Sequence, residues 1–453
     1  MARKFRTADY DATLNLKVSL GDALPPDHLA RFIVDVISQL DLSSIYQQYS
    51  EEGAPPYAPD LLLALLVYGY ATGVFSSRKI ARATYESLPF RFIAGDMHPD
   101  HDTVANFRKQ FLSEIQELFV QVLLVAQEMG YVSLGNISLD GSKIRADASK
   151  SKAVSYRRLL AIEAHLQAQV RELFTLAETA DSSAVPEGMV VEDEIAWRQA
   201  RLKRLAEAKA VLEARAQARY EAEKADYEEK LRQREKKAAK KGRKPRGRPP
   251  KPPSAGPREK EQYNFTDPES RIMKNANNDG FDQHYNVQVA VDQVSRLIVA
   301  QGLSNHPTDR QEALPTVDAI PAGLGRPAAA ALDNGYWSPD NVEGLLQRGI
   351  EPYIATGRDP HHGSWQTYFQ QNTQPTTEDA SAQEKMAYKL HSDIGQAIYR
   401  LRKSTVEPVI GIIKEVLGFR QFSLRGLSAV AGEWTLVCLA FNLKRLHSSH
   451  HGR

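Results

Sequence analysis

Cysteine is almost absent from this chain, since Cys438 is the only one among 453 residues. A lone cysteine cannot form a disulfide within the chain, and it cannot build a cluster of thiolate metal ligands. We therefore expect Cys438 to be buried without a chemical role. Any metal ion would have to be bound by other residue types.

Long apolar runs are missing as well. The longest extends from Leu61 to Val74 and is interrupted by tyrosines and glycines, whereas a membrane-spanning helix needs roughly 18 apolar residues. This run is therefore expected to be a core helix. The first residues lead into the polar Thr7, Asp9 and Asp11 rather than into an apolar signal region. We accordingly expect no membrane association and a cytoplasmic location.

A large excess of one charge is the third absence. The net charge is only +2, and 42% hydrophobic with 25% charged residues is ordinary for a globular protein of two or three domains. Binding to a polyanion would therefore depend on an uneven distribution of charge. The sequence has such a region, because the segment from Arg232 to Lys251 is rich in Lys and Arg and contains Glu235 as its only acid.

Within this basic segment, Arg246-Gly247-Arg248-Pro249 resembles an AT-hook. Such a segment is extended, and its glycine is small enough to enter a narrow minor groove, where A-tracts attract arginine. The alternative is a basic linker that attracts phosphates without reading the sequence. Under either interpretation Arg246 and Arg248 are candidate DNA contacts.

The first of three informative acids is Asp140. It follows residues 136–139, where apolar and polar side chains alternate as in a half-buried strand. Gly141 comes next and is interpreted as the end of that strand. The pattern therefore predicts that the carboxylate of Asp140 emerges at a strand end.

The second acid, Asp333, ends a short apolar run that begins at Pro327 and turns at Asn334. Ser338 followed by Pro339 predicts the start of a helix, and residues 353–355 predict another strand after it. A strand-helix-strand unit implies a partly parallel sheet, in which sites gather at the carboxyl ends of strands. Asp333 is expected at such an end.

The third acid, Glu407, precedes Pro408 and a segment with apolar residues at helical spacing. Because an internal proline disrupts a helix, either a helix starts near Glu407 or an earlier helix kinks there. Lys414 follows two turns later and is expected on the same face as Glu407. A carboxylate and a cation would then share one stripe of the helix.

Together these acids predict a metal site. Hard divalent cations such as Mg²⁺ prefer oxygen ligands and commonly take one or two carboxylates each. Three acids that meet on a sheet can hold two ions roughly 3.5 to 4 Å apart, an arrangement that activates a water or 3′-hydroxyl and stabilises the leaving oxygen of a phosphodiester. Taken singly, each acid is more often a cap or a solvated group. The prediction therefore depends on their order in the fold.

The segments between the acids supply that order. Alternation over residues 285–292 and a second run over 297–303 predict a β-hairpin. Residues 308–320 predict a helix with a kink or restart at Pro315. The expected succession is a strand with the first Asp, a hairpin, a helix, a strand with the second Asp, a helix, a strand and a helix with Glu.

This succession resembles the ribonuclease H-like catalytic domain of the DDE transposases of bacterial insertion sequences. The segment 139–144 is similar to the first-acid strand of that family, 333–336 to its second-acid turn, and 406–427 to its third-acid helix and the stretch that follows. The resemblance implies an α/β ribonuclease H-like domain with a mixed sheet and two Mg²⁺ or Mn²⁺ ions as cofactors. It also implies that the catalytic and metal-binding residues are Asp140, Asp333 and Glu407.

Many relatives carry a Tyr, Arg, Glu, Lys signature with two, three and six residues between successive members. Glu407 and Lys414 fit this spacing, whereas Lys403 fills the Arg position and Arg400 the Tyr position, with Tyr399 one place early. The resemblance implies that cations around the acids grip phosphates, and such contacts position DNA without reading bases. The candidate DNA-binding residues of this domain are Lys143, Arg400, Arg402, Lys403 and Lys414.

Residues 150–262 are predicted to be a helical insertion in the catalytic domain, which comprises residues 131–149 and 263–446. The stretch from Glu192 to Arg232 lacks proline and predicts one long helix or a helical pair. Leu202, Leu205 and Leu212 suggest a heptad seam that Lys209 and Ala216 weaken. A coiled-coil dimer contact, a solvated charged helix and a hairpin within the chain remain open.

Residues 1–130 predict a helical N-terminal domain, which the family resemblance implies is DNA-binding. Helical spacing of apolar residues is found from Asp27, Pro59, Ser77, Asp102 and Ile115 onward. The segment 76–82, with the later helix that carries Asn106, Arg108 and Lys109, suggests a helix-turn-helix. An ordinary helical bundle explains the pattern equally well.

The prediction is a DNA transposase that cleaves transposon ends and joins the 3′-hydroxyl to target DNA. Its partners would be terminal inverted repeats and target DNA, with a homodimer in the DNA complex and a nucleoid-associated location. A stand-alone ribonuclease H-like nuclease is one alternative, although it would not need an end-binding N-terminal domain. A catalytically inactive, transposase-derived regulator is the other, and the presence of all three acids disfavours it.

Overall fold

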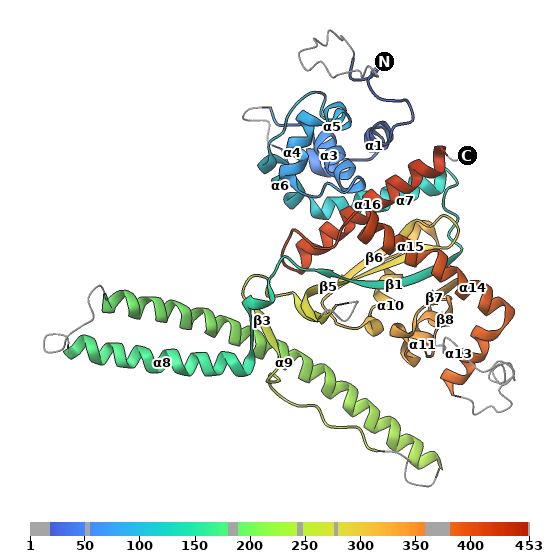
Figure 1. Ribbon diagram of the computed structural model, residues 1–453. Helices are drawn as coiled ribbons and strands as arrows, with labels where there is room; N and C mark the ends of the chain where they lie inside the picture. The colour runs from blue at the N-terminus through green and yellow to red at the C-terminus, as the bar shows by residue number, and fades with distance from the viewer. Residues whose placement is uncertain are drawn as a thin grey trace, which may run out of the picture. The chain divides into compact units, whose positions relative to one another are not determined.

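A computed structural model of the chain describes residues 19–49, 55–179, 189–241, 248–275, 280–357 and 381–451. The chain divides into two compact units. Unit 1 contains residues 1–144 and 286–453, and unit 2 contains residues 145–285. Figure 1 shows the helices and strands with their labels.

The first part of unit 1 is helical, as the apolar spacing predicts (Figure 1). The run from Leu61 to Val74 lies mostly in a helix that begins with Pro59 at its first position and is buried along most of its length. The C-terminal helix packs against this core helix and against the last helix of the N-terminal part. These helices are α1 (Leu29–Ser38), α2 (Ser43–Tyr46), α3 (Pro59–Ala71), α4 (Ser77–Glu86), α5 (Leu88–Ile93), α6 (His101–Gln110), α7 (Leu112–Glu128) and α16 (Leu427–His451).

A buried polar network joins α3, α6 and α16. The carboxylate of Glu433, which is fully buried, accepts a 3.0 Å hydrogen bond from the Tyr70 hydroxyl. Arg108 donates to the same hydroxyl at 2.9 Å and is itself 7% exposed. The charge of Arg108 is therefore directed into the core of the helical bundle, whereas the choice between a helix-turn-helix and an ordinary bundle stays open.

A six-stranded mixed sheet follows the helical part. Its order is β4-β5-β1-β7-β8, with β6 paired to β5. The predicted hairpin is confirmed as the antiparallel pair β5 and β6, and the predicted parallel part is confirmed by β7, which pairs with β1 and β8. The strands are β1 (Asn136–Arg145), β4 (Arg271–Lys274), β5 (Phe281–Asp292), β6 (Ile298–Ser304), β7 (Ala329–Leu332) and β8 (Glu351–Ile354).

Short helices connect these strands and lead to the third acid. Ser338 caps α11 by accepting from the Asn341 amide at 3.0 Å, as predicted. The helix predicted over residues 308–320 is shorter, because α10 begins only at Ala313. Near Glu407 the earlier helix is interrupted, since α14 ends at Ser404 and α15 begins at Val406. The helices are α10 (Ala313–Asp318), α11 (Pro339–Gln347), α13 (Ala382–His391), α14 (Asp393–Ser404) and α15 (Val406–Gly411).

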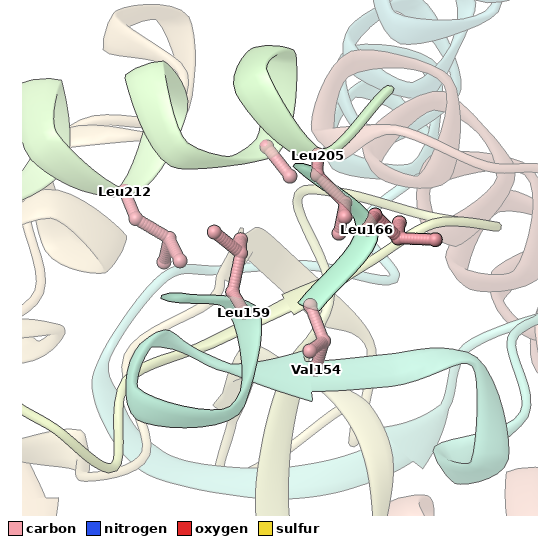
Figure 2. Close-up of a cluster of buried hydrophobic side chains, with 6 residues drawn as sticks. Val154, Leu159, Leu166, Leu205 and Leu212 are labelled. Carbon is pink, nitrogen blue, oxygen red and sulfur yellow. The ribbon is translucent and has the colours of Figure 1, made fainter. Parts of the chain in front are cut away.

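Unit 2 contains two long helices that lie side by side (Figure 1). Leu205 and Leu212 of the predicted heptad seam are buried against Leu159 and Leu166, as Figure 2 shows. The hairpin within the chain is thus confirmed, and the coiled-coil dimer through this seam is wrong, because its apolar residues are already covered. The elements are η1 (Lys150–Lys152), β2 (Ala153–Ser155), α8 (Tyr156–Thr179), α9 (Val191–Lys241) and β3 (Gln262–Asn264).

Two further predictions, on the cysteine and on membrane-spanning helices, can be compared with the described part of the chain. Cys438 is a free, buried thiol in α16, as expected. None of the helices formed by described residues has the length and apolar character needed to cross a bilayer.

Candidate functional site

The strand register places the two aspartates next to each other. Leu139 of β1 is the direct partner of Leu332 of the parallel strand β7. Asp140 and Asp333 each follow one of these leucines, and neighbouring strands are about 4.8 Å apart. Both acids therefore lie directly after the last residue pair of β1 with β7, at the carboxyl edge of the parallel strands.

The expectation that β1 ends at Asp140 is wrong, because the strand continues through Gly141 to Arg145. It is β7 that stops, so β1 extends beyond its parallel neighbour. Asp333 then caps the turn that follows β7 by accepting from the Gly335 amide at 2.8 Å. One acid thus lies within a strand and the other on a tight turn.

Arg402 of α14 connects Asp140 to the third acid. Its guanidinium donates to Asp140 Oδ2 at 3.2 Å and to Glu407 Oε1 at 2.8 Å. The Arg402 side chain is 13% exposed, and its buried Nε has no hydrogen-bond partner among the described residues. Two acids, one from β1 and one from α15, thus share the Arg402 guanidinium.

The break between α14 and α15 is fixed to β1 by a buried hydroxyl pair. The Thr405 hydroxyl donates to the carbonyl of Leu401 at 2.6 Å. It also shares a 3.0 Å hydrogen bond with the Ser138 hydroxyl, and both residues are buried. This anchor holds Arg402 just before the break and Glu407 just after it.

Burial dominates the electrostatics of the aspartates. It raises the pKa of Asp140 to about 7, with the Arg402 charge acting in the opposite direction and Asp333 and Glu407 adding to the rise. Burial also raises the pKa of Asp333, against the hydrogen bond from Gly335. A nearby cation would oppose this effect of burial, as Arg402 already does in part.

A fourth acid, Asp309, was not predicted as a site residue, and it lies at the start of the short 3-10 helix η2 (Asp309–Gln311), to which no sequence motif pointed. Its Oδ1 accepts from Asn286 and from Gln288, both at 2.8 Å. Gln288 and Asp309 lie so close to Gly141 that a side chain there would collide with both. Gly141 is therefore needed for this close approach, and not to end the strand as the sequence suggested.

The predicted DNA-binding residues are placed differently from one another. Lys414 is half-buried and donates to Ser142 Oγ at 3.1 Å, and burial lowers the pKa of its ammonium. Arg400 is exposed and donates to Gln396 at 3.1 Å, and Lys403 is exposed. Lys143 lies on β1 and is partly exposed.

The basic segment of unit 2 is described only in part. Arg246 lies outside the described residues, and Arg248 is exposed. The backbone carbonyl of Arg248 accepts a hydrogen bond from Arg234 at 3.3 Å. The AT-hook interpretation therefore stays a prediction.

The structure changes how the cationic signature before Glu407 is aligned. The sequence placed Lys403 in the Arg position, but it is Arg402 that contacts Asp140 and Glu407. Its guanidinium carbon lies 6.0 Å from the ring centre of Tyr399. The helix break at Thr405 accommodates one extra residue before Glu407, and this break was not visible in the sequence.

The donor chemistry of the site fits hard divalent cations, since the acids supply only oxygen ligands. Within the described ranges, no three His, Cys, Asp or Glu side chains are grouped closely enough to enclose a metal ion. Asp140 and Glu407 instead both bind the Arg402 guanidinium. Burial, with a smaller contribution from Asp333 and Glu407, disfavours the ionised form of Asp140.

Two family models match the chain. A transposase domain model matches residues 18–110, and a transposase DDE domain model matches residues 366–447. The second match includes Arg402, Glu407 and Lys414. No curated protein and no solved structure matches the chain.

These matches lie on either side of the segment that carries the adjacent Asp140 and Asp333, and they support a transposase role. Together they support an insertion-sequence DDE transposase.

Proposed function

We propose that this transposase cleaves the ends of its element and joins the freed 3′-hydroxyl to target DNA by two-metal phosphodiester chemistry. The proposal includes a ribonuclease H-like fold for the catalytic part. The observation that carries it is the register of β1 and β7, which puts Asp140 beside Asp333, combined with Arg402, which links Asp140 to Glu407.

In this proposal Asp140, Asp333 and Glu407 hold two Mg²⁺ or Mn²⁺ ions. When bound, such ions activate the attacking hydroxyl and stabilise the leaving oxygen of the phosphodiester. Arg402 keeps Asp140 and Glu407 oriented toward the same place. Gly141 leaves room for the side chains of Gln288 and Asp309 beside β1.

Cations around the acids bind the DNA backbone in this proposal. Lys414, held over β1 by Ser142, grips a phosphate close to the acids. The exposed Arg400 and Lys403 on α14, with Lys143 on β1, contact phosphates farther along the strand. Such contacts position the DNA and carry no sequence information by themselves.

The remaining regions supply the partners. We assign residues 1–130 to binding of the terminal inverted repeats, residues 131–149 and 263–446 to catalysis, and residues 150–262 to an insertion that adds DNA contacts, including Arg246 and Arg248. Two copies of the chain act together on the two ends of the element. The buried Leu205 and Leu212 show that such a pair would not form through the α9 seam.

The test is cleavage of DNA that carries the inverted repeats flanking the coding frame, in the presence of Mg²⁺. We expect nicking at the repeat ends by the intact chain and none by Asp140→Asn, Asp333→Asn or Glu407→Gln. Asp340→Asn, which changes an exposed acid in the first turn of α11, is the matched control and should cleave normally.

The same assay separates the alternatives. Equal cleavage of DNA with and without the repeats would favour a stand-alone nuclease. Repeat binding without cleavage by the intact chain would favour an inactive regulator. Undiminished cleavage by the three acid variants would contradict the proposal.

A further inference from the structure

A second basic surface lies in unit 2, in a part of the chain that neither family model covers. A pocket of about 540 Å³ opens between α8, α9 and the segment from Ser151 to Val154. That volume is within the range of small-ligand pockets, roughly 300 to 1,000 Å³. Its base is the buried cluster of Figure 2, since Val154 and Leu205 belong to both.

The walls of the pocket combine aromatic rings with positive charge. Trp197 is 55% exposed, although a large apolar ring in a packed helix pair is ordinarily covered. The guanidinium of Arg201 lies 5.4 Å from the centre of that ring, and the guanidinium of Arg204 lies 5.5 Å from the centre of the Phe265 ring. These stacked contacts hold the guanidinium groups at the pocket wall.

The charge of the pocket is of one sign. Its lining contains Lys152, Arg158, Arg201 and Arg204 and no Asp or Glu. None of these four cations forms an ion pair with another residue in the described part of the chain. The adjacent Arg157 differs, because it faces Glu259 at 3.9 Å. Positive charge without carboxylate partners, next to the exposed Trp197 ring and the partly exposed Phe265 ring, is complementary to an anion that also carries flat rings.

We propose that this pocket binds single-stranded DNA, with phosphates on the arginines and a base on the Trp197 or Phe265 face. In a duplex the base faces are covered by their neighbours, so only unpaired nucleotides can use the aromatic walls. The inference rests on the proposed function, because that function makes DNA the substrate. It assigns to unit 2 a contact with strands that are unpaired during the reaction.

The test uses the full chain in EDTA, so that the metal site does not contribute. Binding of a labelled oligothymidylate and of a duplex of equal length is measured by fluorescence anisotropy. We expect Trp197→Ala to weaken single-strand binding about fivefold or more, the lower limit for loss of one stacked base. Trp197→Phe should restore most of the affinity, and duplex binding should change less than twofold.

The charge contribution is tested by the double variant Arg201→Gln with Arg204→Gln, for which we expect weaker single-strand binding and a smaller salt dependence. Arg157→Gln is the matched control and should bind like the unmodified chain. Circular dichroism checks folding, which we expect to be intact because the substituted side chains are exposed and lie outside the buried cluster.

Three results would overturn the proposal. These are unchanged single-strand affinity in Trp197→Ala, equal losses for single strand and duplex, or displacement of the labelled oligothymidylate by an acidic peptide as readily as by unlabelled oligothymidylate. The Asp140→Asn variant separates this inference from the proposed function. Normal cleavage by that variant would refute the catalytic proposal, while the binding measurements in EDTA would still decide the role of the pocket.

Discussion

Replacing Arg402 with glutamine should make the protein depend on divalent cations for its stability. Arg402 is the cation that bonds both Asp140 and Glu407. Without it, Asp140 and Asp333, whose pKa values are raised, and the partly exposed Glu407 would lie near one another with no cation bonded to them. A bound Mg²⁺ or Mn²⁺ would then supply the positive charge that the arginine no longer provides.

The expected magnitude follows from the two hydrogen bonds. The bond to Asp140 spans 3.2 Å between side chains that are 13% and 19% exposed, and a hydrogen bond to a charged group contributes about 1.5 to 3 kcal/mol. The bond to Glu407 contributes about 1 kcal/mol at most, because that side chain is 42% exposed. Arg402→Gln should therefore lower the unfolding free energy of the metal-free protein by about 2 to 4 kcal/mol.

The assay is urea unfolding followed by circular dichroism, in EDTA and in saturating Mn²⁺. We expect Mn²⁺ to raise the unfolding free energy of the variant by about 2 kcal/mol more than that of the unmodified chain, since binding to the folded state stabilises it. Lys403→Gln removes an exposed cation from the same helix and serves as the control. An identical loss of stability with and without Mn²⁺ would refute the idea that the arginine and the metal ions neutralise the same acids.

Three further predictions concern pH, positioning and stability. Because the pKa of Asp140 is about 7 instead of 3.8, the metal-free folded protein binds more protons than the unfolded chain between these values, so its stability should fall as pH rises through that range. Asp140→Asn should flatten this fall by up to about 4 kcal/mol, and an unchanged pH profile in urea titrations would contradict the assignment. Thr405→Val removes the hydroxyl that bonds Ser138 and should lower the cleavage rate about tenfold or more, with recovery in Thr405→Ser; normal cleavage by the valine variant would show that the anchor is dispensable. Glu433→Gln leaves the donors around a fully buried carboxylate unmatched and should cost about 3 to 5 kcal/mol in the free energy of unfolding, so a loss below about 1 kcal/mol in urea would disprove the importance of the network.

Much of the fold followed from local chemistry. The cap formed by Ser338 and the proline after it correctly predicted α11, because both signals act within one turn of chain. Alternation over β5 and β6 correctly predicted their hairpin, because period two is diagnostic of strands. The adjacency of Asp140 and Asp333 follows from the parallel pairing of β1 with β7.

The errors occurred where contacts between distant segments decide the outcome. Gly141 has the sequence signature of a strand end, but its lack of a side chain makes room for Gln288 and Asp309. Arg402 and Lys403 are adjacent cations, and only the helix break at Thr405 determines which of them faces the acids. No local pattern carries that information.

The helices of unit 2 are a further case in which contacts between distant segments decide a question that the sequence leaves open. The thin heptad seam of Leu205 and Leu212 is compatible with pairing between chains or within one chain, because both bury the same stripe of side chains. The presence of α8 beside α9 decides for pairing within the chain. Trp197 carried no signal in the sequence, and its importance emerges only from its exposure next to the stacked arginines.

The central claim is that Asp140, Asp333 and Glu407 serve one cation site, and Mn²⁺ binding measured by isothermal titration calorimetry tests it most directly. The account predicts that Asp140→Asn, Asp333→Asn and Glu407→Gln each weaken Mn²⁺ binding about tenfold or more, while Asp340→Asn leaves it unchanged. Unaltered Mn²⁺ affinity in any of the three acid variants would contradict the claim.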